Sequence, residues 1–209
     1  MSDKKTKFKI AGLPKAQGLY NPVNEHDACG VGMVLDIKNR ASFDIVEKGL
    51  AMLCNLEHRG AVGADPKAGD GSGLLIQIPH KFLDKKVSKN FSLPKPGHYA
   101  VGVMFIPDNS SDDKKIKKLV EDVCEKEGFN ILGWRLCPTY TDELGWSVLP
   151  STPIVYQLFI ERPDTEKSQD NFERKLYILR RCIEKAVLEI SNEIKEGFYI
   201  PSFSSRTIL

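Results

Sequence analysis

The stretch of residues 153–162 constrains the fold of this chain most, because it is apolar on both of its faces. It reads PIVYQLFIER, so large apolar side chains occupy consecutive positions and not only alternate ones. A strand with one face in water shows strict alternation, whereas a strand that is apolar throughout needs cover on both sides. The sequence therefore predicts a sheet that is buried under other elements on both faces.

Helical and strand patterns are interleaved along the chain. Apolar spacings of three and four predict helices at residues 43–57, 114–127 and 170–195. Apolar or alternating runs predict strands at residues 31–35, 74–78, 98–106, 129–137, 153–162 and 198–205. The polar stretch 81–90 is expected to end the strand before it, His80 is a surface residue or the start of a helix, and no internal repeat is present. This order predicts stacked layers of helix and sheet, that is, an α+β fold.

Composition excludes several classes of protein. The formal net charge of +2 gives no argument for binding to nucleic acid or to a membrane surface. No apolar run approaches the length of a membrane span, and no secretory signal opens the chain. The five cysteines are widely spaced and form no CxxC pair, which argues against a disulfide framework or a zinc site. We expect a reducing compartment, the cytoplasm or, in a eukaryote, a plastid.

The stretch around Cys29 offers catalytic chemistry. Ala28 precedes it, and Gly30 and Gly32 follow it directly before an apolar run. If the bond after Ala28 is cut, Cys29 carries both a thiol and a free α-amine. An α-amine has an ordinary pKa near 8, so it can serve as the base that activates the thiol. On this stretch alone, a buried structural cysteine at the start of a strand stays open as the alternative.

The first 28 residues fit such a cleavage. They are polar, contain several glycines, prolines and asparagines, and show neither a helical nor a strand period. Such a segment is typical of a flexible tail, and a leader peptide that is removed must also be accessible. We therefore expect a leader at residues 1–28 and a folded domain at residues 29–209.

The predicted helix 43–57 ends in the sequence His-Arg-Gly, with Gly60 as a natural C-cap. Cys54 lies beside the apolar face of this helix and is expected in the core. Arg59 has two interpretations: it complements the negative end of the helix dipole, or it reaches toward Cys29 and fixes the nucleophile loop.

A glycine-rich loop covers residues 63–73. It lacks the Gly-Lys-Ser/Thr ending of a phosphate-binding loop and runs into a strand instead of a helix, which argues against a nucleotide site. A tight turn around Asp70 and Gly71 that packs against the active site fits better. The loop 138–153 is rich in proline, threonine and acidic residues, and its length suggests a binding edge or an interface, with no specific role assigned.

Four blocks carry a resemblance to a known family. In chain order they read CGVG from Cys29, NLEHRGA from Asn55, GDGSG from Gly69 and QIPH from Gln77. A later pair, FYIPS from Phe198 and SSRTI from Ser204, follows in the same order. Together they resemble the class II glutamine amidotransferase domain of the glutamate synthase large subunit, and they cover most of residues 29–209.

The resemblance implies a four-layer αββα fold of the N-terminal-nucleophile hydrolases, incomplete in this chain. It implies that Cys29 becomes the first residue, attacks the side-chain amide of glutamine and forms a thioester, with its α-amine as base. Ammonia leaves and the thioester is hydrolysed to glutamate. Arg59, Gly60, Asp70 and Gly71 would support the nucleophile loop and the substrate.

The resemblance also implies partners outside this chain. Ammonia would pass to a synthase centre in downstream domains of the same polypeptide, where FMN and an iron–sulfur cluster are expected. No cofactor or metal is expected in the chain itself. A small electron-transfer subunit or ferredoxin is a further expected partner, and the electron donor (NADPH, NADH or ferredoxin) and the oligomeric state stay open.

The sequence departs from the family in two places. The family's oxyanion hole is an Asn-Gly pair, and an arginine in a His-x-Arg-Phe-Ser-Thr-Asn block holds the substrate carboxylate; neither block occurs here. One oxyanion donor is typically worth about 3–4 kcal/mol of barrier. We therefore expect these 209 residues alone to be weakly active or inactive.

Two other functions stay open. One is a stand-alone amidotransferase-like module that binds a partner or glutamine without turnover. The other is an unrelated cysteine hydrolase with a Cys–His pair, in which the base is one of four histidines: His26, His58, His80 or His98.

Overall fold

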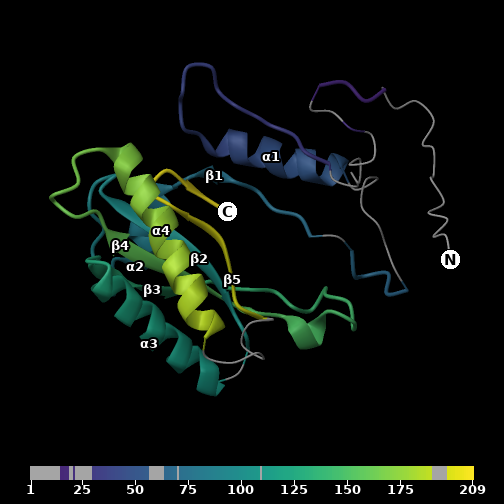
Figure 1. The fold of residues 1–209 in the computed structure, drawn as a ribbon. Coiled ribbons are helices and arrows are strands. Elements are labelled where there is room, and N and C mark those ends of the chain that lie inside the picture. The colour runs from purple at the N-terminus through teal and green to yellow at the C-terminus, as the bar shows by residue number, and fades with distance from the viewer. Residues whose placement is uncertain are drawn as a thin grey trace.

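The computed structural model describes residues 15–18, 21, 30–56, 64–69, 71–108, 110–189 and 197–209 (Figure 1). Their helices and strands are, in order, α1 (Phe43–Asn55), β1 (Ile76–Gln77), α2 (His80–Val87), β2 (Tyr99–Ile106), α3 (Ser110–Lys126), β3 (Ile131–Leu136), the 3₁₀ helix η3 (Leu149–Ser151), β4 (Ile154–Glu161), α4 (Gln169–Leu188), β5 (Tyr199–Ser204) and β6 (Thr207–Ile208). This mixture of helices and antiparallel strands agrees with the predicted α+β class. Within the described part, no helix is both long and apolar enough to cross a membrane.

The centre of the molecule is a four-stranded antiparallel sheet with the order β3-β4-β2-β5. Its longest ladder joins β2 to β4, from Tyr99 opposite Glu161 to Ile106 opposite Ile154. A second, two-stranded sheet pairs β1 with β6, so that Ile76 lies opposite Ile208. The stretch that constrained the fold most is therefore an interior strand, β4, as its apolar faces require.

Helices α3 and α4 cover one face of the four-stranded sheet, as Figure 1 shows. Helix α4 begins after Ser168, whose side chain accepts a hydrogen bond from the Asn171 N–H at 3.4 Å. Its buried side chains recur at spacings of three and four, as the sequence predicted: Phe172, Leu176, Leu179, Ile183 and Val187. They pack against Ile116, Val120 and Cys124 of α3 and against the inner residues of β2, β4 and β5.

A second apolar cluster covers the opposite face of the sheet. Leu83 and Val87 of α2 pack with Tyr99, Val101 and Val103 of β2, with Phe159 of β4 and with Ile208 of β6. The prediction that the sheet is covered on both faces is thus confirmed. The cover on this side comes from a short helix and the small β1–β6 sheet.

Helix α2 occupies much of the polar stretch 81–90, for which the sequence predicted only the end of the preceding strand, and it begins at His80, one of the two places the sequence left open for that residue. Lysines and an aspartate dominate this stretch, so its apolar spacing is weak. Its two buried positions, Leu83 and Val87, lie four residues apart on one helix face. The predicted strand at 74–78 is shorter than expected, because only Ile76–Gln77 pairs, and the side chain of Leu75 is 60% exposed.

The predicted buried strand at residues 31–35 is wrong for this structure. The segment forms no strand, and Val31 and Met33 are 91% and 80% exposed. In the described part of the chain no strand pairs with it, and of its apolar side chains only that of Val34 is partly buried. Cys54 is likewise exposed on α1, whereas the sequence placed it in the core.

Candidate active site

Most of the predicted site residues lie outside the residues that the structure describes. These are Cys29, Arg59, Gly60 and Asp70. Gly71 is described: it is exposed, and a Cβ atom added to it would meet nothing within 4 Å. The geometry of the site is therefore built from the described residues that border the others in sequence.

Helix α1 supports the segment that follows Cys29. A Cβ atom on Gly30 would lie 3.0 Å from Cδ2 of Leu56, the residue that directly follows α1 and precedes the stretch with Arg59. A Cβ atom on Gly32 would lie only 2.1 Å from Sδ of Met52. The glycines after Cys29 thus allow this segment to approach the C-terminal end of α1 closely.

The same helix contacts the segment that follows Asp70. A Cβ atom on Gly49, in the middle of α1, would lie 2.8 Å from Cδ1 of Leu74. One position earlier, a Cβ atom on Gly73 would lie 3.4 Å from Cδ1 of Leu209. Helix α1 therefore contacts both glycine-containing segments that border predicted catalytic or supporting residues.

Asp65 connects the glycine-rich loop to the loop 138–153. Its side chain is buried, and its Oδ2 accepts hydrogen bonds from the backbone N–H and the hydroxyl of Ser147, both at 2.8 Å. Its Oδ1 accepts a third from the N–H of Lys67 at 3.1 Å. The Ser147 N–H, above all, holds the pKa of this carboxyl below its ordinary range, because hydrogen bonds favour the charged form.

The SSRTI block lies on the turn between β5 and β6, and α4 holds it. Oε1 of Glu173 accepts a hydrogen bond from the Ser205 N–H at 2.7 Å, and its Oε2 accepts one from the Ser204 hydroxyl at 2.9 Å. Nε2 of Gln169 donates to the Ser205 hydroxyl at 3.1 Å. These contacts fix the turn that leads into β6, the partner of β1.

Two of the four histidines are described, and both have partners elsewhere. Nδ1 of His80 lies 3.1 Å from the hydroxyl of Tyr99. Nδ1 of His98 lies 3.4 Å from Nη2 of Arg162. Burial raises the pKa of Tyr99 to about 12, because the charged form loses water there. His26 and His58 lie outside the described residues.

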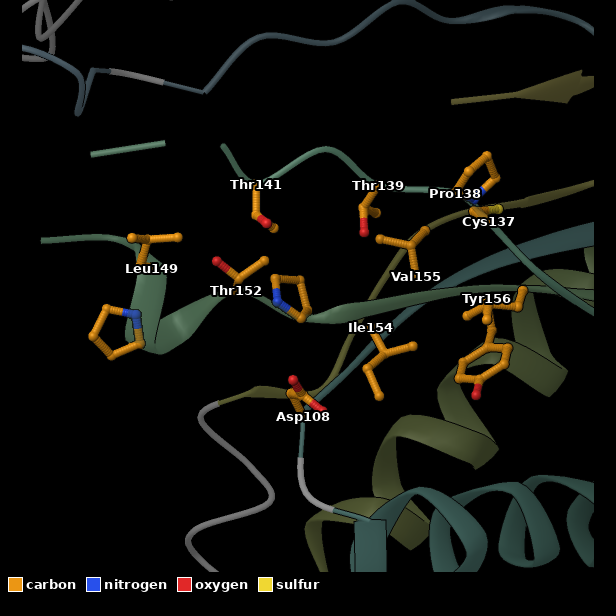
Figure 2. A pocket seen from close by; sticks show the side chains of 13 residues that line it. Asp108, Cys137, Pro138, Thr139, Thr141, Leu149, Thr152, Ile154, Val155 and Tyr156 are labelled. Carbon is orange, nitrogen blue, oxygen red and sulfur yellow. The ribbon is translucent and has the colours of Figure 1, made fainter. Parts of the chain in front are cut away.

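A cavity of about 730 Å³ lies where β3 ends and β4 begins. Figure 2 shows the side chains that line it. Among the described residues its wall includes Cys137, three threonines and several residues of the loop 138–153, but not Gly71, the one predicted site residue that the structure describes. Burial raises the pKa of the Cys137 thiol, although the Arg135 guanidinium opposes this by donating to Sγ at 3.4 Å. A thiol with a raised pKa is a poor nucleophile, so this cavity does not replace the predicted site.

Sequence reasoning missed Asp65 and Ser147. The signal for Asp65 was local: an Asp-Pro pair favours the start of a turn, and an aspartate side chain often accepts from the backbone two residues on. Nothing in the sequence indicated its partner 82 positions away. Among the described residues, no group of three histidine, cysteine or acidic side chains could hold a metal ion.

Comparison with known proteins gives a consistent result. The family model described as "Glutamine amidotransferases class-II" matches residues 29–209. Over 94% of its length the chain is 44% identical to "Glutamate synthase [NADPH] large chain" of Bacillus subtilis and 36% identical to "Glutamate synthase [NADH]" of Schizosaccharomyces pombe. Over its whole length it is 34% identical to "Ferredoxin-dependent glutamate synthase 1, chloroplastic/mitochondrial" of Arabidopsis thaliana. The matches cover 13%, 9% and 13% of these three relatives, so the chain spans a small part of their length.

Proposed function

The chain belongs to the class II glutamine amidotransferase family, as the N-terminal amidotransferase domain of a glutamate synthase large chain, and on this premise we propose that it releases ammonia from glutamine at Cys29. One observation carries the proposal: the family match begins at Cys29 and not at Met1. That start agrees with a mature domain whose first residue is the nucleophile.

In the proposed reaction the Cys29 thiolate attacks the side-chain amide carbon of glutamine. The α-amine of the same residue takes the thiol proton and passes it to the leaving nitrogen, so ammonia departs and a thioester remains. Water then attacks the thioester, glutamate leaves, and the thiol and the amine are restored. The α-amine exists only after residues 1–28 are removed, so this leader keeps the precursor inactive.

Arg59, Gly60, Asp70 and Gly71 support this centre. Arg59 and Gly60 order the nucleophile loop, and Asp70 and Gly71 form a turn beside the substrate. A Cβ atom added to Gly71 would meet open space, which leaves room for a ligand to approach the backbone there. We place these residues in a four-layer αββα fold of which residues 29–209 are one part.

The remainder of such a polypeptide supplies the other half of the reaction. Ammonia passes to a synthase centre that holds FMN and an iron–sulfur cluster, which is reduced by a small electron-transfer subunit or by ferredoxin. The names of the relatives include NADPH, NADH and ferredoxin as donors, which supports the synthase assignment without choosing among them.

Replacement of Cys29 in the full-length protein tests the proposal. We expect Cys29→Ala and Cys29→Ser to abolish glutamine-dependent glutamate formation, while activity with added ammonia remains. Mass spectrometry of the mature protein should find Cys29 at its N-terminus. A mature protein that begins at Met1, or full glutamine-dependent turnover in Cys29→Ala, would contradict the proposal. Binding of glutamine without any turnover in the wild type would indicate the binding module instead.

Replacement of the histidines separates the proposal from a Cys–His hydrolase. His80→Ala and His98→Ala should keep the alkylation rate of Cys29, because the proposed base is its own α-amine. His26→Ala changes only the leader, and His58→Ala tests the position next to Arg59. A loss of thiolate reactivity in any one of these variants, at unchanged folding, would favour the Cys–His pair.

A further inference from the structure

Both oxygens of the Asp65 carboxylate accept hydrogen bonds, although the residue lies in a loop. Asp65 is 5% exposed, and its two oxygens accept three hydrogen bonds, two from Ser147 and one from Lys67. A buried carboxylate is stable only when such donors replace the water that it has lost. Two of the three donors lie in a distant part of the sequence, so the contact joins two loops.

The loop that receives Asp65 is shaped around its carboxylate. A Cβ atom on Gly145 would lie 2.3 Å from Oδ2 of Asp65, which no side chain at that position could tolerate without displacing it. Only glycine lets the backbone of the loop 138–153 come this close. The contact is therefore built from both sides: a carboxylate on one loop, and a hydroxyl, an N–H and a glycine on the other.

Groups of opposite charge contribute little to the contact. Lys67 lies near Asp65, but its Nζ is 3.5 Å from the carboxylate of Glu143, which is 92% exposed. An exposed pair of this kind is weak in water. The hydrogen bonds from Ser147, and not the charges, thus hold the two loops together.

The contact also fixes the start of the segment that leads from Asp65 to Gly69. The N–H of Ala68 donates to the carbonyl oxygen of Asp65 at 3.1 Å, which closes a turn just before Gly69. Beyond Asp70, a Cβ atom on Gly73 would lie 3.4 Å from Cδ1 of Leu209, so the chain passes close to this residue. A segment that is fixed at its start can support a functional geometry a few residues further on.

We infer that Asp65 is a positioning residue for glutamine hydrolysis. Through its bonds to Ser147 of the loop 138–153 it fixes the start of the segment that leads to Gly71, where we proposed a turn beside the substrate. This inference rests on the proposed function and gives that loop a role. Asp65 itself does not touch the substrate: it acts through the turn.

The test uses the full-length protein with three variants and a double mutant. Asp65→Asn keeps the size of the side chain but replaces one acceptor oxygen with an NH₂ group, which cannot accept the hydrogen bonds of the neighbouring donors. Ser147→Ala removes the hydroxyl, and with it one of the two hydrogen bonds to Oδ2 of Asp65. The double mutant combines them, and Glu143→Gln is the matched control on the same loop. For each variant we would measure kcat/KM for glutamine, the melting temperature, and the rates at which Cys29 reacts with 6-diazo-5-oxo-L-norleucine and with iodoacetamide.

We expect Asp65→Asn to lower kcat/KM and the rate with the glutamine-shaped reagent by about 10- to 100-fold, the usual cost of a misplaced substrate contact. The rate with iodoacetamide, which needs no substrate site, should not change. Ser147→Ala should cause a smaller loss of kcat/KM. In the double mutant it should add no further loss to that of Asp65→Asn, because the effects of residues in direct contact are not additive. Glu143→Gln should behave as the wild type.

Two outcomes would overturn the inference. In one, Asp65→Asn lowers the melting temperature but changes neither kcat/KM nor the rate at which Cys29 reacts with the glutamine-shaped reagent, which would show a purely structural role. In the other, Cys29 reacts more slowly with both reagents by the same factor, which would show a general disturbance of Cys29. If Asp65→Asn does not fold, the same comparison of the two reagent rates in Ser147→Ala decides whether the inference holds. Failure of the proposed function gives a different result, because wild-type Cys29 would then not react with the glutamine-shaped reagent.

Discussion

Individual residues decide where distant segments of this chain meet. Asp65 reaches Ser147, and the glycines at positions 32, 49 and 145 each leave room for a neighbour that a side chain would displace. The sequence shows where these glycines stand, but not which segments approach them. For the same reason Cys54 was wrongly placed: spacing put it beside an apolar face, and only the structure shows that α1 leaves this side exposed.

Two glycine-to-alanine variants should behave in opposite ways. A Cβ atom at position 71 meets open space, so Gly71→Ala should leave the free energy of unfolding unchanged and, under the proposed function, reduce glutamine hydrolysis. A Cβ atom at position 133 would lie 2.4 Å from the ring of Phe91, which packs on Phe159, so Gly133→Ala should cost about 1–3 kcal/mol. Urea denaturation and a glutaminase assay measure both effects. Equal stability of the two variants would contradict this.

Buried acids should make the chain sensitive to alkali. Burial raises the pKa of Tyr99 from 10.0 and that of Cys124 from 9.0, in each case to about 12. Between these values the unfolded chain has lost protons that the folded chain keeps, so the free energy of unfolding falls as pH rises from about 9 to about 12. Each pKa unit is worth about 1.4 kcal/mol, so the part due to Tyr99 is about 2–3 kcal/mol.

The check on this is denaturation at a series of pH values. Tyr99→Phe should flatten the decline above pH 10, since this group then no longer titrates. Tyr140→Phe is the matched control, because that ring is exposed. The charged and polar neighbours of the two groups are His80 and Asp84 for Tyr99 and Glu121 for Cys124. An unchanged slope in Tyr99→Phe would refute the assignment.

At the scale of elements, the sequence predicted what its apolar spacing makes unambiguous. Helix α3, the described part of helix α4 and strands β2 and β4 lie where spacing placed them, because their buried residues recur regularly along each element. Residues 190–195 of the helix predicted at 170–195 lie outside the described part of the chain. Helix α2 was not predicted, because three apolar residues among lysines, only two of them buried, give too little of a pattern. The segment 31–35 has the composition of a strand, but a strand needs a partner, and pairing between distant segments is not written in local spacing.

Helix α4 should carry much of the stability of the described core. Leu179 is fully buried, so Leu179→Ala should lower the free energy of unfolding by about 2–5 kcal/mol, the cost of a cavity in a packed core. Ile178, the next residue, points away from the core and is more than half exposed, so Ile178→Ala should cost far less. Chemical denaturation of the two variants checks this, and similar losses for both would show that the face of α4 is assigned wrongly.

At the scale of the whole molecule, the family followed from sequence blocks, whereas the active site did not follow from the described structure. The chain corresponds to 13% or less of the relatives compared above. We therefore predict that residues 1–209, produced alone, hydrolyse glutamine far more slowly than the full-length protein, because the expected oxyanion donors and carboxylate clamp are missing from them. A glutaminase assay on both proteins is the measurement, and near-equal turnover would disprove the prediction.

The exposed segment after Cys29 has a consequence for handling the isolated chain. Val31, Met33, Leu35 and Ile37 are each more than half exposed, and no described strand pairs with this segment. An exposed apolar segment of this kind can pair with the same segment of a second molecule. Concentrated samples should therefore become turbid through intermolecular β-pairing. A gatekeeper charge, Met33→Lys, should keep the solution clear without touching the packed sheet.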